Sequence, residues 1–112
     1  MLKVTFEQRD NSLTLKIEGH AGQADIGHDI VCASASILAY TVAQFVKEAE
    51  GSGYLKSLAE IKLDSGDAVV SCEPTEEMLI DMQNIYLFAE KGYELLAHNY
   101  PQYVELKTFG TE

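Results

Sequence analysis

The sequence predicts a single α/β domain in which two helices cover one mixed sheet. Two observations lead to this prediction. Segments of alternating apolar and polar residues, typical of half-buried strands, stand at both ends and in the middle of the chain, and two long segments with helical spacing separate them. The chain has 112 residues, about the size of one domain, and 46% of them are apolar. We therefore expect the order ββαββαβ within one domain over residues 1–112.

The first two elements are predicted to form a β-hairpin. Apolar residues occupy every second position in residues 2–8 and again in residues 13–18. Residues 9–12 read Arg-Asp-Asn-Ser, in which Asp and Asn favour a tight turn. The hairpin should end at Gly19 and His20.

A loop over residues 19–29 follows. It contains three glycines and little periodicity. Loops of this length are uncommon in small domains and often have a function.

Residues 30–50 are predicted to form a largely buried helix. Asp29 is well placed as its N-cap, and Gly51-Ser52-Gly53 should end it. Its expected buried face consists of Val31, Ala35, Leu38, Val42, Phe45 and Ala49, and a second face of small residues of Cys32, Ser36, Ala39 and Ala43.

The second half of the chain repeats this arrangement. Residues 57–73 are expected to form a hairpin, with Leu58 in its first strand and a turn at residues 64–67. A helix should begin after Pro74, with Thr75 as its cap, and end at Tyr100-Pro101. Residues 103–107 are predicted to form the last strand.

Charge and composition restrict the function. With 18 acidic and 8 basic residues the formal net charge is -10, and no basic cluster is present. Nucleic-acid binding depends on neutralisation of phosphates, so we expect no direct RNA or DNA partner. The beginning of the chain lacks an apolar signal segment, and we expect no membrane-spanning run. The two cysteines, Cys32 and Cys72, are expected to be free thiols in a reducing cytoplasm.

Cys32 and His20 are the candidate catalytic residues. Cys32 stands one turn into the predicted helix, where unpaired N–H groups and the helix dipole favour a thiolate and can stabilise an oxyanion. A nearby imidazole at His20 would complete the activation. The alternative is that Cys32 is a small core residue and His20 a surface residue, because the spacing alone does not place them in contact.

A zinc site is a further alternative. His20, His28 and Cys32, with Asp25 and Asp29 nearby, supply nitrogen, sulfur and oxygen ligands, but their spacing matches no familiar zinc signature. We therefore expect neither a metal nor another cofactor. Cys72 is interpreted as a packing residue of a strand.

The window from Gly19 to Ser36 resembles the family of ribosomal-processing cysteine proteases called Prp. Gly19-His20-Ala21 is followed after seven residues by Asp29-Ile30-Val31-Cys32-Ala33, within the longer run Gly27-His28-Asp29-Ile30-Val31-Cys32-Ala33-Ser34-Ala35-Ser36. The chain length and the ββαββαβ order are also similar to those of this family.

The resemblance implies a cytoplasmic endopeptidase needed for ribosome maturation. Its substrate would be a large-subunit ribosomal protein, from which it removes a short N-terminal extension by cutting after aromatic residues. His20 would be the general base and Cys32 the nucleophile. Family members are dimers, so a homodimer is expected. The supporting or substrate-binding positions would be Gly19, Ala21, Gly22, Gly27, Asp29 and Ser36.

Two of these positions keep alternative interpretations. Asp29 either caps the helix, which we favour, or orients His20 as a third catalytic member. Ser36, one turn beyond Cys32, either forms a hydrogen bond in the site or permits close packing. For the whole protein, the alternative function is a noncatalytic acidic factor that binds or assembles basic ribosomal proteins.

Overall fold

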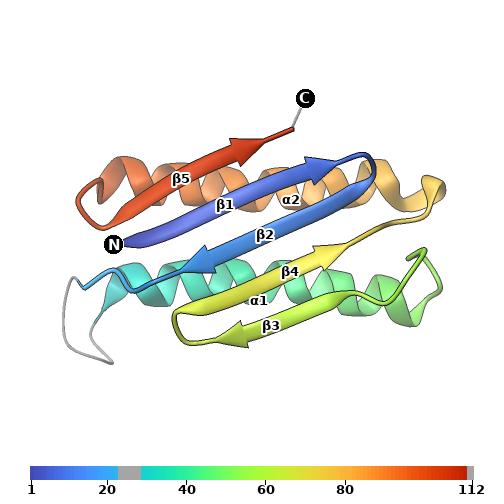
Figure 1. Cartoon of the computed structure of the whole chain (residues 1–112), viewed down its shortest axis with the longest axis horizontal. Coiled ribbons are helices and arrows are strands. Elements are labelled where there is room, and N and C mark those ends of the chain that lie inside the picture. Colours follow the sequence, from blue (N-terminus) through green and yellow to red (C-terminus); the bar gives the residue numbers. More distant parts are fainter. Residues whose placement is uncertain (23–28, 111–112) are drawn as a thin grey trace.

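The computed structural model of the chain describes residues 1–22 and 29–110, and its elements follow the predicted order. Seven helices and strands form one α/β domain, as Figure 1 shows. They are β1 (Leu2–Arg9), β2 (Ser12–Glu18), α1 (Ile30–Gly51), β3 (Glu60–Asp64), β4 (Asp67–Cys72), α2 (Glu76–Asn99) and β5 (Val104–Phe109).

The five strands form one mixed sheet in the order β3-β4-β2-β1-β5 (Figure 1). β1 and β5 are parallel, and every other neighbouring pair is antiparallel. β2 pairs with β4 so that Glu18 lies opposite Asp67. This register places the turn between β3 and β4 beside the residues that follow β2, although the two segments are far apart in the sequence.

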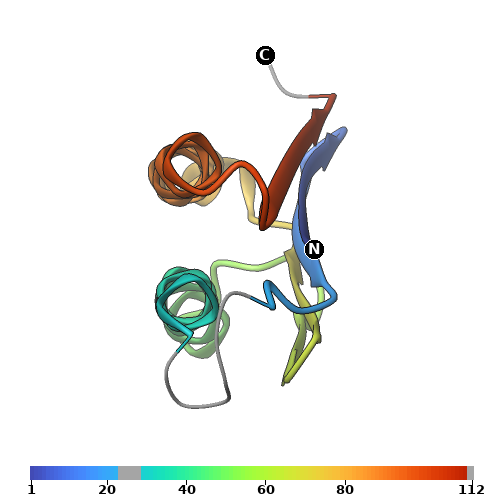
Figure 2. The same cartoon turned by 90° about the vertical axis from the view of Figure 1, so that its left-hand side faces the viewer.

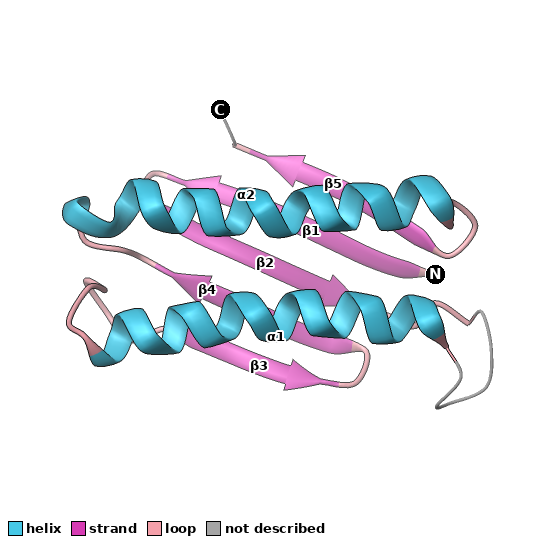
Figure 3. Cartoon of the chain, turned by 180° about the vertical axis from the view of Figure 1, so that it is seen from behind, coloured by secondary structure: helices cyan, strands magenta, loops and turns pink. Residues whose placement is uncertain are grey.

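Both helices cover the same face of the sheet (Figures 2 and 3). The apolar residues predicted for the first hairpin, such as Val4, Phe6 and Leu15, are buried on this face. Alternation in the strands therefore places apolar side chains under the helices and leaves polar side chains on the open face. The largest fully buried side chains are those of Tyr93, Leu15, Met82, Val4, Val31, Val42, Val46, Val70 and Pro74.

Two of the predicted packing positions were wrong. Phe45 is 45% exposed, and Val46 is buried in its place. The helix carries apolar residues around much of its circumference, so spacing alone did not show which arc meets the sheet. Leu58 is 87% exposed and precedes β3. The backbone N–H of Lys56 is bonded to the carbonyl oxygen of Glu73, so the chain first pairs with the segment after β4 and then bends at residues 56–57 before β3 begins.

Helix α1 also departs from the expectation that no segment reaches the length of a membrane span. Its 22 residues make it long enough to cross a membrane, and its mean hydropathy of 1.5 makes it apolar enough. Core helices of soluble proteins meet the same criterion. In this fold one side of α1, from Val31 to Ala49, is buried as part of the core.

The helices are linked to each other by a buried hydrogen bond. Tyr93 of α2 donates its hydroxyl to the backbone oxygen of Ala35 in α1, at 2.8 Å. Thr75 is the N-cap of α2 as predicted, but its side chain makes no capping bond and its buried hydroxyl has no partner in the described part of the chain.

Candidate functional site

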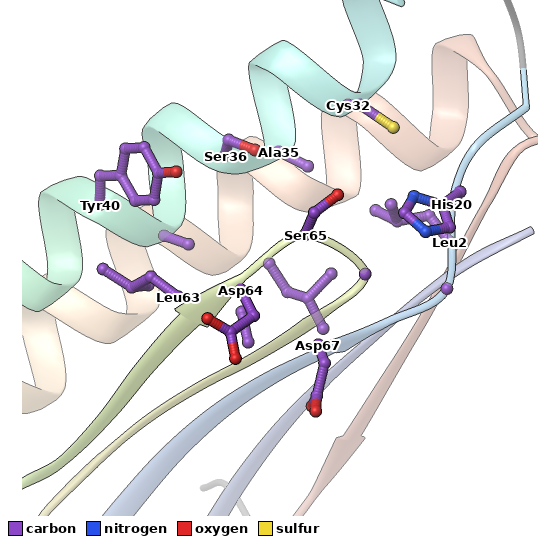
Figure 4. A pocket seen from close by; sticks show the side chains of 15 residues that line it. Leu2, His20, Cys32, Ala35, Ser36, Tyr40, Leu63, Asp64, Ser65 and Asp67 are labelled. Atoms are coloured by element: carbon purple, nitrogen blue, oxygen red, sulfur yellow. The ribbon is translucent and has the colours of Figure 1, made fainter. Parts of the chain in front are cut away.

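A pocket of about 220 Å³ lies between the first half of α1 and the turn that joins β3 to β4. Figure 4 shows the side chains of Cys32 and His20 entering it from different walls, Cys32 from α1 and His20 from the segment after β2. The sequence prediction that these two residues share a site is therefore consistent with the fold. The remaining lining residues are Leu2, Ile17, Gly19, Ala35, Ser36, Ala39, Tyr40, Leu63, Asp64, Ser65, Gly66, Asp67 and Ala68.

Asp29 fixes the start of α1, and with it Cys32. The Asp29 side chain accepts the backbone N–H of Cys32 at 2.9 Å, as an N-cap residue does. This contact confirms the interpretation of Asp29 as a cap. It also fixes Cys32 within the first turn, where its side chain reaches the pocket.

The surroundings of Cys32 disfavour its thiolate. Partial burial is the largest cause, and it raises the pKa of the Cys32 thiol above its ordinary value. A hydrogen bond from the Ala21 backbone lowers this pKa, whereas the hydrogen bond to Asp29 and its negative charge raise it. The expected preference for thiolate at the helix start is thus not met in this geometry.

His20 is exposed, and its ring lies against the backbone of the β3–β4 turn. A Cβ placed on Gly66 would stand 2.6 Å from His20 Nε2. Among the described residues the His20 ring has no hydrogen-bond partner, and none of their bonds joins it to Cys32 Sγ. The ring nitrogens are therefore available for a hydrogen bond to a group that enters the pocket.

The other predicted positions lie close to this pair. Gly19 lines the pocket, and its φ is +88°. Ala21 is buried, and its backbone forms a hydrogen bond with the Cys32 thiol. Gly22 has a φ of +70°, and no atom of the described residues lies within 4 Å of a Cβ built on it. Ser36 lines the pocket, and its side chain makes no hydrogen bond to any residue that the structure describes.

Three predicted contributors cannot be placed. Gly27 lies outside the described residues, and so do His28 and Asp25 of the alternative zinc site. Within residues 1–22 and 29–110, no three His, Cys, Asp or Glu side chains gather into a group able to hold a metal ion. The described residues therefore give no support to the alternative of a zinc site.

The sequence analysis missed the second wall of the pocket. This wall is the β3–β4 turn, Asp64-Ser65-Gly66-Asp67, together with Leu63. The turn itself was predicted, but its position beside His20 follows from the pairing of β2 with β4, which local patterns do not show. Tyr40 was also missed, although its position two turns after Cys32 on α1 is a signal that helical spacing offers.

The family model of the cysteine protease Prp matches residues 1–105 of the chain. Nearly the whole domain is included in this match, with both pocket walls. A search of curated proteins found no match.

Solved structures share the fold. The essential ribosomal processing protease Prp from S. aureus, in complex with a covalently linked product peptide, is 20% identical with a TM-score of 0.72; the match covers 96% of this chain and 99% of that one. The same protein with a substrate peptide gives 18% identity, a TM-score of 0.68 and the same coverages. SMU.848 from Streptococcus mutans is 24% identical with a TM-score of 0.69, over 97% of this chain and 94% of that one.

Proposed function

The chain belongs to the cysteine protease Prp family, and from this premise we propose that Cys32 and His20 are its catalytic pair. One observation carries the assignment. Cys32 and His20 belong to different elements, and both line the same open pocket, whereas the other described cysteine, Cys72, is buried in the core. A thiol and an imidazole that share a substrate-accessible pocket are the elements of acyl transfer by a cysteine nucleophile.

The reaction follows from these two side chains. His20 takes the proton of Cys32, and the sulfur then forms a bond to the carbonyl carbon of the peptide. The C–N bond breaks as the imidazolium returns the proton to the departing amine, which leaves a thioester on Cys32. Water, deprotonated by His20, cleaves the thioester and restores the thiol. Because the pKa of Cys32 is raised above its ordinary value, a base that takes its proton assists the first step.

The start of α1 supplies the remaining requirement, stabilisation of the oxyanion. The first N–H groups of a helix have no intrahelical partner, and the positive end of the helix dipole lies there. Asp29 uses the N–H of Cys32, so the remaining amides of this turn are the candidate donors. Such preorganised donors are typically worth a factor of about 10² to 10³ in kcat.

We propose that the substrate is a large-subunit ribosomal protein with a short N-terminal extension, cut after aromatic residues, and that its removal is needed for ribosome maturation. The net charge of -10 favours encounter with a basic ribosomal protein. From Cys32 the pocket extends along Ala35 and Ala39 of α1 toward Tyr40 and Leu63, a lining suited to large apolar side chains.

We also propose that the protein acts in the cytoplasm as a homodimer. Two free thiols are compatible with a reducing compartment. Exposed apolar side chains on the helix layer, Ile80, Phe88 and Leu95 of α2, supply a surface for self-association.

The first test is cleavage of the ribosomal protein that carries its extension, read by mass spectrometry. Wild-type protein should make a single cut after the aromatic residues. Cys32→Ala should lose all detectable cleavage, and Cys72→Ala is the matched control because it removes the same atoms from a buried thiol outside the pocket. Cleavage by folded Cys32→Ala would overturn the assignment of the nucleophile.

A second outcome supports the noncatalytic alternative. If folded wild-type protein binds the ribosomal protein in a salt-sensitive way but leaves it intact, the acidic surface rather than the thiol carries the function.

A further inference from the structure

The ring of His20 occupies the space that a side chain at position 66 would need. A Cβ built on Gly66 would lie 2.6 Å from Nε2, 2.9 Å from Cε1 and 3.4 Å from Cδ2 of His20. The approaches of 2.6 and 2.9 Å are closer than non-bonded atoms allow, so a residue with a side chain at position 66 displaces the ring or the turn.

The backbone of Gly66 is bound to the same segment that carries His20. Its carbonyl oxygen accepts the N–H of Gly19 at 3.0 Å, directly before His20 in the chain. One step further along, Glu18 and Asp67 are opposite each other in the β2–β4 ladder. A main-chain hydrogen bond and the strand pairing therefore hold the turn in register with the segment that carries His20.

Gly19 is confined from its other side. Its φ is +88°, and an added Cβ would lie 2.5 Å from the carbonyl oxygen of Met1. The segment that leads into His20 is thus fixed between the start of β1 and the β3–β4 turn. The direction in which the ring then points is limited by the surface it lies on, and that surface is the bare backbone of Gly66.

We propose that Gly66 is a positioning residue for His20, and that the absence of a side chain there sets the distance between the imidazole and Cys32. The inference rests on the proposed catalytic pair and adds to it the β3–β4 turn. Its physical basis is that proton transfer requires heavy atoms within hydrogen-bond reach, and a misplacement of about 1 Å costs on the order of 10²-fold in rate.

The substitution Gly66→Ala tests this, and Gly53→Ala is its matched control. Both glycines have left-handed backbones, with φ of +76° at Gly66 and +80° at Gly53, so both substitutions strain the chain alike. Among the described residues only Gly66 has a neighbour, because none of their atoms lies within 4 Å of a Cβ on Gly53. In the peptide-cleavage assay we expect Gly66→Ala to lower kcat by about 10- to 100-fold with little change in KM, and Gly53→Ala to match the wild type.

Gly66→Asn is the second variant, because Asn tolerates a left-handed backbone but still places a Cβ against the ring. It keeps the test valid if Gly66→Ala fails to fold. The expected loss of kcat is the same, with Gly53→Asn as the control.

A second measurement separates this inference from the proposed protease function. The rate of Cys32 alkylation by iodoacetamide, followed against pH, reports how well His20 assists loss of the thiol proton, and it needs no substrate. Gly66→Ala should shift this profile toward that of His20→Ala. In the His20→Ala background, Gly66→Ala should then cause no further shift, because the ring that the new methyl group meets is gone.

The outcomes divide clearly. If no peptide is cleaved but the alkylation profiles behave as described, the positioning role stands and the protease function fails. Wild-type kinetics and alkylation in folded Gly66→Ala would overturn the inference. An equal shift with and without His20 would also overturn it, since Gly66 would then act on the turn alone.

Discussion

Asp29 has two opposing effects on its neighbour. Its side chain caps α1 and holds the N–H of Cys32, which keeps the candidate nucleophile in place. The same carboxylate raises the pKa of the Cys32 thiol by its charge and by accepting a hydrogen bond from the thiol. Precise placement of the sulfur is therefore gained at the expense of its acidity.

We predict that Asp29→Asn lowers the pKa of Cys32. The amide oxygen can still accept the N–H of Cys32, and Asn is as good a cap as Asp, so the helix start is kept. The negative charge is lost, the thiolate becomes less unfavourable, and the midpoint of the iodoacetamide alkylation profile should move to lower pH. Asp81→Asn, which removes an exposed carboxylate of α2, should leave the midpoint unchanged. A midpoint that stays or rises in Asp29→Asn would contradict this account.

For single residues, the sequence predicted contacts between residues close together in the chain. It missed contacts between residues that are far apart in the chain. The cap of α1 involves Asp29 and Cys32, three positions apart, and helix geometry alone indicates it. The contact of His20 with Gly66 joins two loops that become neighbours only through strand pairing. The sequence around a turn glycine does not indicate which distant side chain will lie against its backbone.

Among the elements, α1 has the most demanding role. It contributes seven buried residues to the core along its length, and its first turn presents Cys32 to the pocket. The position of α1 relative to α2 is fixed partly by a hydrogen bond. The Tyr93 hydroxyl of α2 donates to the carbonyl oxygen of Ala35, one turn after Cys32. Gly92 of α2 leaves room for Leu38 of α1, where an added Cβ would stand 2.8 Å from Leu38 Cδ1.

We predict that Tyr93→Phe lowers the free energy of unfolding by about 1 kcal/mol, the typical net value of one buried hydrogen bond. Urea denaturation measures this change. Tyr103→Phe is the matched control, because the half-buried Tyr103 hydroxyl makes no hydrogen bond to another described residue, and its loss should cost little. Equal effects of the two substitutions would show that the Tyr93–Ala35 bond contributes nothing.

The helices and strands were largely predictable, because the spacing of apolar residues differs between the two and can be recognised in the sequence. All seven appear in the predicted order. What periodicity did not supply was the rotation of α1, where Phe45 was expected inside and Val46 lies there instead. A helix with apolar residues on several sides fits the sheet in more than one rotation, and packing against β-branched and small residues decides among them.

The whole molecule is asymmetric, with helices on one face of the sheet and none on the other (Figure 2). The helix layer carries exposed apolar side chains, among them Ile80 at 69%, Phe88 at 80% and Leu95 at 64% exposure. Such side chains on a soluble domain are favourable once a second copy covers them.

We predict that Phe88→Glu converts the proposed homodimer into a monomer, because it would place a charge inside the interface. Sedimentation velocity at micromolar concentration is the measurement. Phe109→Glu is the control: Phe109 is 51% exposed and lies on β5, away from the helices. A wild-type protein that sediments as a monomer would refute the dimer, and a dimeric Phe88→Glu would move the interface elsewhere.

The pairing of β2 with β4 also has a consequence for biosynthesis. His20 and Cys32 leave the ribosome early and close together, but the turn against which His20 lies is translated later, and β4 later still. A nascent chain that ends before β4 therefore contains both side chains and most of the turn, but not the strand whose pairing with β2 places the turn beside His20. On the proposed positioning role of this turn, incomplete translation products that end before β4 should be inactive rather than poorly selective.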